Sequence, residues 1–143
     1  MSDRKLENEL GYWEEKIDEL DKRRTDAAKM GGEANVARQH AAGRLTVRER
    51  IGGISDEGSF REVGTLAGTG TYDDNLKLEG VTPATYVAGL AKIDGRSVAI
   101  GGEDFTVRGG TSFGAQRRKG GQGGYIEDLA HHYKIPLVNL IDG

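Results

Sequence analysis

The residues best suited to chemistry lie in one glycine-rich, basic stretch, which runs from Gly101 to Gly124 and reads GGEDFTVRGGTSFGAQRRKGGQGG. Its candidate binding residues form a glycine turn and a basic pair: Gly109, Gly110, Thr111, Ser112, Arg118 and Lys119. Backbone amides at a glycine turn that opens a helix bind anions, and nearby basic side chains add positive charge. Residues of these types are suited to contact with phosphate groups. The alternative is that the glycines only allow close packing of a strand and a helix, with the basic side chains in solvent.

The histidines and the glycine-rich stretch do not complete a familiar catalytic motif. No GK[ST] sequence closes the stretch, so it is not the Walker A loop of a nucleotide triphosphatase. His131 and His132 are adjacent in a segment with helical spacing, where neighbouring side chains point about 100° apart and rarely share a metal ion. We interpret them as surface or interface histidines.

The acidic residues and the lack of cysteine argue against a metal site. The pairs Asp73-Asp74 and Glu103-Asp104 do not have EF-hand spacing. We expect Asp104 to orient its own turn by accepting hydrogen bonds from nearby amides. The sequence contains no cysteine, which excludes a disulfide scaffold and a thiolate metal site. We predict no metal in this chain, and the sequence assigns no catalytic side chain.

The bulk composition restricts the class of protein. The chain has 143 residues, enough for one core of ordinary size. Its 23 glycines, with apolar runs between them, favour a globular protein with many tight turns over a disordered one. A net charge of −3 argues against a dedicated nucleic-acid binder. The charged N-terminus is not a secretory signal, and no apolar run reaches the ~20 residues that cross a bilayer. We expect a cytoplasmic protein without a membrane partner.

The chain begins with a predicted amphipathic helix over residues 1–30. Its apolar residues alternate steps of four and three, which gives one narrow stripe: Leu6, Leu10, Trp13, Ile17 and Leu20. The pattern is too short for a coiled coil and predicts a helix docked on its own or a sister subunit. The polar, glycine-marked residues 31–45 are predicted to be a linker.

The remaining residues predict an α/β fold. Thr46 and Glu49 have the spacing of a capping box, so a short helix should follow and end before Ser55. A β region should begin between Phe60 and Val63. Between Tyr86 and Ile100, two apolar runs flank Asp94-Gly95, a pair suited to the type I′ turn of a hairpin.

The C-terminal part reads as a helix followed by a strand. Apolar residues at helical spacing are Ile126, Leu129, Ala130 and Tyr133. Pro136 should stop this helix, and 137–141 reads as a buried strand. Strand, helix and strand in this order predict a layered α/β fold with a largely parallel sheet. The chain ends directly after that strand, where α/β proteins place ligand-binding loops, so an interrupted domain is expected.

Four ordered blocks resemble a known family: RQHAAGRLTVRERI (38–51), DEGSF (56–60), KIDGRSVAIGGEDFTVRGGTSFGAQRRK (92–119) and IPLVNLIDG (135–143). They are similar to carboxyltransferase (beta) subunits of biotin-dependent acyl-CoA carboxylases, of the propionyl-CoA and methylcrotonyl-CoA types. The most specific piece is DFT at 104–106 followed by Gly109-Gly110. The resemblance covers residues 38–143.

The resemblance implies a crotonase-like (ClpP/crotonase) fold of stacked β-β-α units, of which residues 46–143 would be the first part of the N-domain. It implies transfer of a carboxyl group from carboxybiotin to the α-carbon of an acyl-CoA, with backbone amides stabilising the oxyanions. The glycine turn and the Arg118-Lys119 pair would then bind CoA. Biotin would be carried by a biotin carboxyl carrier or biotin carboxylase subunit. A homo-oligomer, or the missing C-terminal half, would complete the active site.

The resemblance also sets limits. The family's glycine pair that faces biotin follows the strand ending in Asp, and this chain ends at Asp142-Gly143. We therefore expect the chain to be inactive alone. Residues 120–124 depart from the family, because four glycines interrupt a helix at up to about 1 kcal/mol each. Three alternative functions stay open. The chain could belong to a biotin-dependent acyl-CoA decarboxylase subunit, or to a split subunit completed by a second chain. It could also be a non-catalytic assembly module that docks through residues 3–28.

Overall fold

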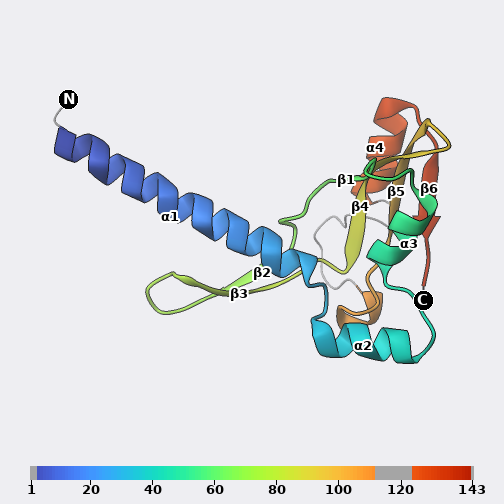
Figure 1. Ribbon diagram of the computed structural model, residues 1–143, viewed down its shortest axis with the longest axis horizontal. Coiled ribbons are helices and arrows are strands. Elements are labelled where there is room, and N and C mark those ends of the chain that lie inside the picture. Colours follow the sequence, from blue (N-terminus) through green and yellow to red (C-terminus); the bar gives the residue numbers. More distant parts are fainter. Residues whose placement is uncertain (1–2, 112–123, 143) are drawn as a thin grey trace.

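The computed structural model describes residues 3–111 and 124–142 (Figure 1). Its elements follow in the order α1 Asp3–Ala28, α2 Glu33–Ala41, α3 Val47–Ile54, β1 Arg61–Glu62, β2 Thr69–Tyr72, β3 Leu78–Thr82, β4 Tyr86–Ile93, β5 Arg96–Glu103, the 3₁₀ turn η1 Arg108–Gly110, α4 Tyr125–Tyr133 and β6 Leu137–Leu140.

The predicted N-terminal helix is confirmed as α1. Figure 1 shows it extending away from the rest of the chain, with the β2–β3 hairpin beside its C-terminal half. The side chains of Trp13 and Ile17 on its apolar stripe are 63% and 55% exposed. By contrast, Ala27 near the helix end is buried. The described chain therefore leaves Trp13 and Ile17 uncovered, and docking on a sister subunit stays a prediction.

The β2–β3 hairpin has no counterpart in the sequence-based prediction. Its turn is organised by Asp73, whose Oδ1 accepts hydrogen bonds from the amides of Asn75 (2.9 Å) and Lys77 (2.8 Å). The hairpin is joined to α1 by Lys22, whose Nζ donates to the carbonyl of Glu79 at 3.2 Å. Its strands, TGTY and LEGVT, lack the apolar alternation that would have revealed them.

The segment predicted to be a linker contains a helix, which corrects that expectation. Helix α2 occupies Glu33–Ala41 inside residues 31–45. The reason is that this stretch holds good helix formers, while its glycines lie outside the helix. Gly32 and Gly43 flank α2 with φ of 85° and 73°, the left-handed region that glycine tolerates. The proposed division of the chain at residues 30 and 45 stays a prediction.

The predicted capping box and the short helix after it are both confirmed. The hydroxyl of Thr46 accepts a hydrogen bond from the amide of Glu49 at 3.3 Å. In return the Glu49 carboxylate accepts from the amide of Thr46 at 2.7 Å. Helix α3 ends at Ile54, as expected. Its buried side chains, Val47 and Ile51, hold it against the sheet.

The main sheet has the strand order β1-β4-β5-β6. The predicted hairpin is confirmed: β4 and β5 are antiparallel, and Asp94 and Gly95 have φ of 49° and 75°, as a type I′ turn requires. The β1–β4 pair is also antiparallel, and among the strands that the structure describes only the β5–β6 pair is parallel. The largely parallel sheet predicted from sequence is therefore wrong. A tight hairpin forces antiparallel pairing, and only the crossover through α4 gives a parallel pair.

Two layers of helix enclose the β4–β5 hairpin. On one face α3 packs against a cluster that includes Val87, Val98 and Ile100. On the other face α4 packs against Tyr86, Ala88 and Ala99. Successive strand residues point to opposite faces, so the strands are buried on both faces over Tyr86–Gly89 of β4 and 98–102 of β5.

Strand β6 differs from the prediction of a buried strand. Its Leu137 is 37% exposed, and Ile141, just beyond its end, is 65% exposed. The reason is position: β6 is the edge of the described sheet, with a partner strand on one side. Apolar composition predicted the strand correctly but did not reveal which neighbours cover it.

Candidate functional site

The candidate site is built on the turn that follows β5. Asp104, which is 1% exposed, accepts hydrogen bonds on Oδ1 from the amide (3.0 Å) and hydroxyl (2.5 Å) of Thr106. Its own amide donates to the carbonyl of Thr85 at 2.9 Å. Burial raises the pKa of Asp104, although the bonds from Thr106 and the charge of Arg48 oppose that shift. The expectation that Asp104 orients its turn is confirmed.

Next in the chain is the η1 turn, which holds two of the six predicted binding residues, Gly109 and Gly110, in a left-handed backbone. Arg108, Gly109 and Gly110 have φ of 50°, 61° and 73°. This left-handed region suits glycine but costs an arginine about 1–2 kcal/mol. The amides of Gly110 and Thr111 donate to the carbonyls of Val107 (2.9 Å) and Arg108 (3.2 Å). Two amides expected to face phosphate are therefore engaged inside the turn.

Ser112, Arg118 and Lys119 lie outside the described residues. Their grouping with Gly109, Gly110 and Thr111 stays a prediction. The same holds for the expected helix break at 120–124, of which Gly124 is described as the residue before α4.

A contact from the N-terminal part of the chain fixes the position of this turn. The amide of Gly31 donates a hydrogen bond to Oγ1 of Thr106 at 2.9 Å. A Cβ atom at Gly31 would overlap the carbonyl of Thr106, so this position requires glycine. The corner between α1 and α2 therefore lies directly on the candidate site, a relationship that no local sequence signal indicated.

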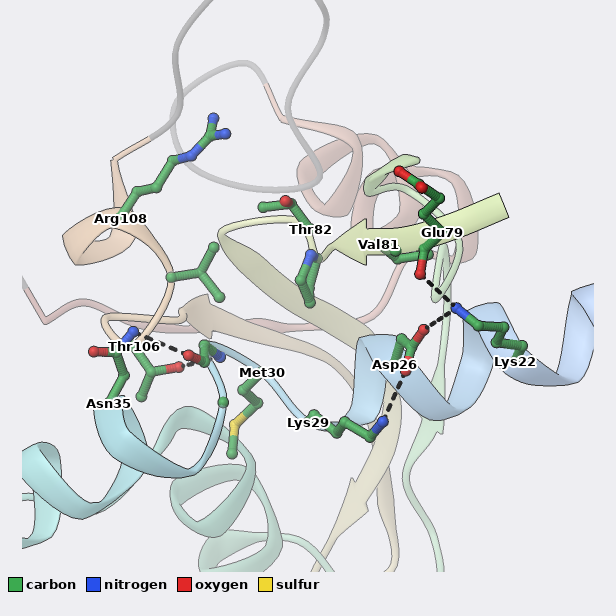
Figure 2. A pocket seen from close by; sticks show the side chains of 15 residues that line it. Lys22, Asp26, Lys29, Met30, Asn35, Glu79, Val81, Thr82, Thr106 and Arg108 are labelled. Carbon is green, nitrogen blue, oxygen red and sulfur yellow. Dashed lines mark hydrogen bonds and ion pairs between the residues drawn. The ribbon is translucent and has the colours of Figure 1, made fainter. Parts of the chain in front are cut away.

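A first pocket, here called the arm pocket, lies between the end of α1, β3 and the 106–108 turn, and has a volume of about 550 Å³. Figure 2 shows Arg108 at one end and Lys22 with Asp26 at the other. The lysines of this pocket share one carboxylate partner: Lys22 and Lys29 both bond Asp26, at 3.0 Å and 2.8 Å. These two bonds lower the pKa of Asp26.

A second pocket, here called the arginine hollow, adjoins the first at Asn35, Thr106 and Arg108, and has a volume of about 470 Å³. Three of its lining residues are arginines from different segments: Arg38 on α2, Arg44 in the loop before α3, and Arg108 on η1. The Arg44 guanidinium lies 5.7 Å from the centroid of the Phe105 ring. No carboxylate among residues 11–111 and 124–142 forms an ion pair with these arginines.

The sequence analysis did not single out these arginines. Arg38 and Arg44 were noted only as members of a basic block, and Arg108 only as part of the DFTVRGG run. The available signal for an anion site was the presence of arginines with few acidic residues close to them in the sequence. It could not show that the three side chains border the same pocket.

The chain end near β6 is held by a separate polar cluster. The carboxylate of Asp142 accepts from Nε2 of the buried Gln39 at 3.3 Å and lies 3.7 Å from Arg50. The amide of Asp142 donates to Glu103 at 3.0 Å. This cluster joins α2 and α3 to the carboxyl ends of β5 and β6, next to the candidate site.

Other candidates have plain structural roles. His131 and His132 are exposed on α4, as expected of surface histidines. Within the described residues, no three histidine, cysteine or acidic side chains are grouped so that they could hold a metal ion. None of the helices in that same part of the chain is long and apolar enough to span a membrane.

Comparison with known proteins assigns the family. The model of the carboxyl transferase domain matches residues 38–143. This chain belongs to the carboxyl transferase domain family. A carboxyl transferase relative from Mycobacterium tuberculosis, the biotin-dependent acetyl-/propionyl-coenzyme A carboxylase beta5 subunit, is 37% identical over 90% of this chain. The chain spans 23% of that relative's length.

Two further carboxyl transferase relatives extend the comparison. The methylmalonyl-CoA decarboxylase subunit alpha of Propionigenium modestum is 33% identical over 89% of this chain, which spans 24% of its length. The solved structure of the transcarboxylase 12S hexamer, with methylmalonyl-coenzyme A bound, has 36% identity and a TM-score of 0.55. That match covers 66% of this chain and 18% of the other. The α/β, crotonase-like fold is confirmed, with β4, β5 and α4 forming one β-β-α unit before β6.

Proposed function

We propose that this chain is the acyl-CoA-binding part of a carboxyltransferase, which moves a carboxyl group from carboxybiotin to the α-carbon of an acyl-CoA. The observation that carries the proposal is the position of Arg108, without a carboxylate partner in the described chain, beside the left-handed Gly109-Gly110 turn. Both lie in the segment that matches the family model. A cationic site beside an exposed turn is suited to the phosphates of CoA.

The residues of the proposed site either bind the phosphate or hold the backbone in place. Arg108 supplies charge, and its planar guanidinium can donate two parallel hydrogen bonds to a phosphate. The Asp104–Thr106 pair and the Gly31 amide hold the backbone that presents it. Ser112, Arg118 and Lys119 belong to the same proposed site and would add donors along the bound CoA.

Biotin is the cofactor that the family implies, carried by a partner subunit or domain. The pockets beside the candidate site are polar and rich in arginine and lysine, which suits phosphates better than the uncharged ureido ring of biotin. These two pockets therefore do not fit biotin, and we assign it no step here. The amides that stabilise the oxyanions of carboxyl transfer would come from other parts of the whole protein.

For this reason we expect the 143-residue chain to bind acyl-CoA without transferring a carboxyl group. Homo-oligomerisation, or pairing with the remaining length that the relatives have, would complete the active site. A cytoplasmic location stays part of this proposal.

Isothermal titration of the full chain with propionyl-CoA tests the binding function. We expect binding that weakens about tenfold or more in Arg108→Asn, because asparagine tolerates the left-handed backbone but removes the charge. Propionyl-pantetheine, which lacks the nucleotide phosphates, should bind much more weakly than propionyl-CoA. Arg96→Gln is the matched control, because Arg96 is an exposed arginine at the opposite end of β5. Failure of propionyl-CoA to bind at about 1 mM would refute the proposal.

A decarboxylase is the second candidate, favoured by the similarity to the methylmalonyl-CoA decarboxylase subunit. The CoA-binding residues would be the same in both enzymes. Assay of the whole protein with its biotin-carrying partner separates them. Carboxylation of propionyl-CoA that needs bicarbonate and ATP indicates a carboxylase, and release of CO₂ from methylmalonyl-CoA without ATP indicates a decarboxylase.

A non-catalytic assembly module is the third candidate, and the exposed stripe of α1 favours it. It predicts self-association without CoA binding. The same titration, combined with sedimentation analysis, distinguishes it from the first two.

A further inference from the structure

Three arginines without an ion-pair partner in the described part of the chain line the arginine hollow. Arg38, Arg44 and Arg108 come from positions up to 70 residues apart and line one pocket. No acidic side chain among the described residues lines it, and no carboxylate within 11–111 and 124–142 pairs with these arginines. Like charges that share a pocket repel one another. The hollow is therefore a place where a bound anion would relieve repulsion.

The neighbouring arm pocket provides an internal comparison. Its Lys22 and Lys29 are both bonded to Asp26, and Lys22 also donates to the carbonyl of Glu79. Both lysines therefore have a carboxylate partner within the protein, whereas the three arginines of the hollow have none in the described part of the chain. An anion that reaches this part of the surface should therefore bind in the arginine hollow rather than in the arm pocket.

The side chains of the hollow indicate which anion fits. An arginine donates in a planar fork that matches phosphate oxygens, and it stays charged at all relevant pH values. Arg44 lies over the Phe105 ring, which orients its guanidinium and leaves its edge free to donate. A terminal phosphate monoester has three free oxygens and a charge near −2, against one charge per group in a diphosphate linkage. Three arginines, each able to donate two parallel hydrogen bonds, therefore match the three free oxygens of a monoester better than those of a diphosphate linkage.

We propose that the arginine hollow is the subsite for the terminal phosphate monoester at the nucleotide end of an acyl-CoA. This assignment rests on the proposed acyl-CoA binding for the identity of the ligand. It adds that Arg38, Arg44 and Arg108 select for the monoester, so the chain distinguishes CoA from dephospho-CoA.

Titration of the full chain with CoA and with dephospho-CoA tests the proposal, because the two ligands differ only in the monoester. We expect CoA to bind about tenfold or more tightly. In Arg38→Gln and in Arg44→Gln, the affinity for CoA should fall towards the affinity for dephospho-CoA. The affinity for dephospho-CoA should stay within about twofold of its value in the unmodified chain. Arg44→Lys, which keeps the charge without the fork, should lose part of the selectivity.

Lys29→Gln is the matched control, since it removes a nearby positive charge that is already paired. It should leave the preference for CoA unchanged. Circular dichroism of each variant checks that it folds. Equal affinities of the unmodified chain for CoA and dephospho-CoA would overturn this subsite and leave acyl-CoA binding intact. Binding of neither ligand would overturn both proposals.

Discussion

The amide of Gly31 donates a 2.9 Å hydrogen bond to Oγ1 of Thr106, across 75 residues of sequence. Thr106 in turn donates to the buried Asp104 at the end of β5. These two bonds join the corner between α1 and α2 to the turn that carries the candidate CoA site. The position of the N-terminal helices and the shape of the site are therefore linked. A substitution at the α1–α2 corner should change the conformation of the 104–110 turn.

Replacing Gly31 with alanine should destabilise the protein. The added Cβ would lie closer than 3.0 Å to the Thr106 backbone, which cannot move without breaking its bonds to Asp104. Such overpacking costs about 1–3 kcal/mol. Urea unfolding measures the change. Gly11→Ala in α1 is the control, because nothing lies within 4 Å of that position and alanine favours a helix, so equal effects of the two variants would contradict the assignment.

Asp104→Asn should change how stability depends on pH. Burial raises the pKa of Asp104 in the folded state above its ordinary value of 3.8. Its contribution to stability is therefore present below pH 3.8 and is lost as the pH rises through the raised folded-state pKa. Asparagine has an oxygen that can accept the same bonds and does not titrate. Relative to this variant, the unmodified chain should lose stability between acidic and neutral pH, measured by thermal unfolding at several pH values.

Asp104→Ala provides the structural counterpart of that experiment. It would leave the amide and hydroxyl of the buried Thr106 without their acceptor, at a cost of about 1–3 kcal/mol. If alanine and asparagine behave alike at every pH, Asp104 does not organise the turn.

Glu49→Gln should have the opposite dependence on pH. Hydrogen bonds from His40 and Thr46 lower the pKa of Glu49 from 4.5 to about 2 in the folded state. The stabilisation is therefore present above pH 4.5 and is lost as the pH falls through about 2. The difference in melting temperature between the unmodified chain and the variant should shrink over that range. Glu57→Gln, at an exposed site outside the helices, should show no such trend.

Ile17→Glu should weaken association between subunits. Ile17 is 55% exposed on the stripe of α1 that the described chain leaves uncovered. A charge placed in an apolar contact would be desolvated without a partner. Sedimentation velocity should show a shift towards smaller species. Asp18→Asn, which changes the next residue of the same exposed helix, is the control, and equal sedimentation of the unmodified and Ile17→Glu chains would contradict docking through the stripe.

Several local elements could be predicted because their signals lie within a few residues. Asp94-Gly95 has the backbone freedom that a type I′ turn needs, and the hairpin is there. Thr46 and Glu49 cap α3 by bonds that span one helical turn. The apolar spacing of 126–130 predicted the buried face of α4. The ordered blocks from residue 38 onward were enough to predict the family.

What the amino-acid sequence determined by itself was therefore the type and order of most elements and the family. The tertiary structure alone decided that β6 is an exposed edge, that 33–41 is a helix docked near the site, and that Gly31 supports Thr106. It also decided that Arg38, Arg44 and Arg108 border one hollow. Turn chemistry and periodicity act over a few neighbouring residues, and the sequence states them directly. Burial and charge clustering depend on which distant segments pack together, which only the folded chain determines.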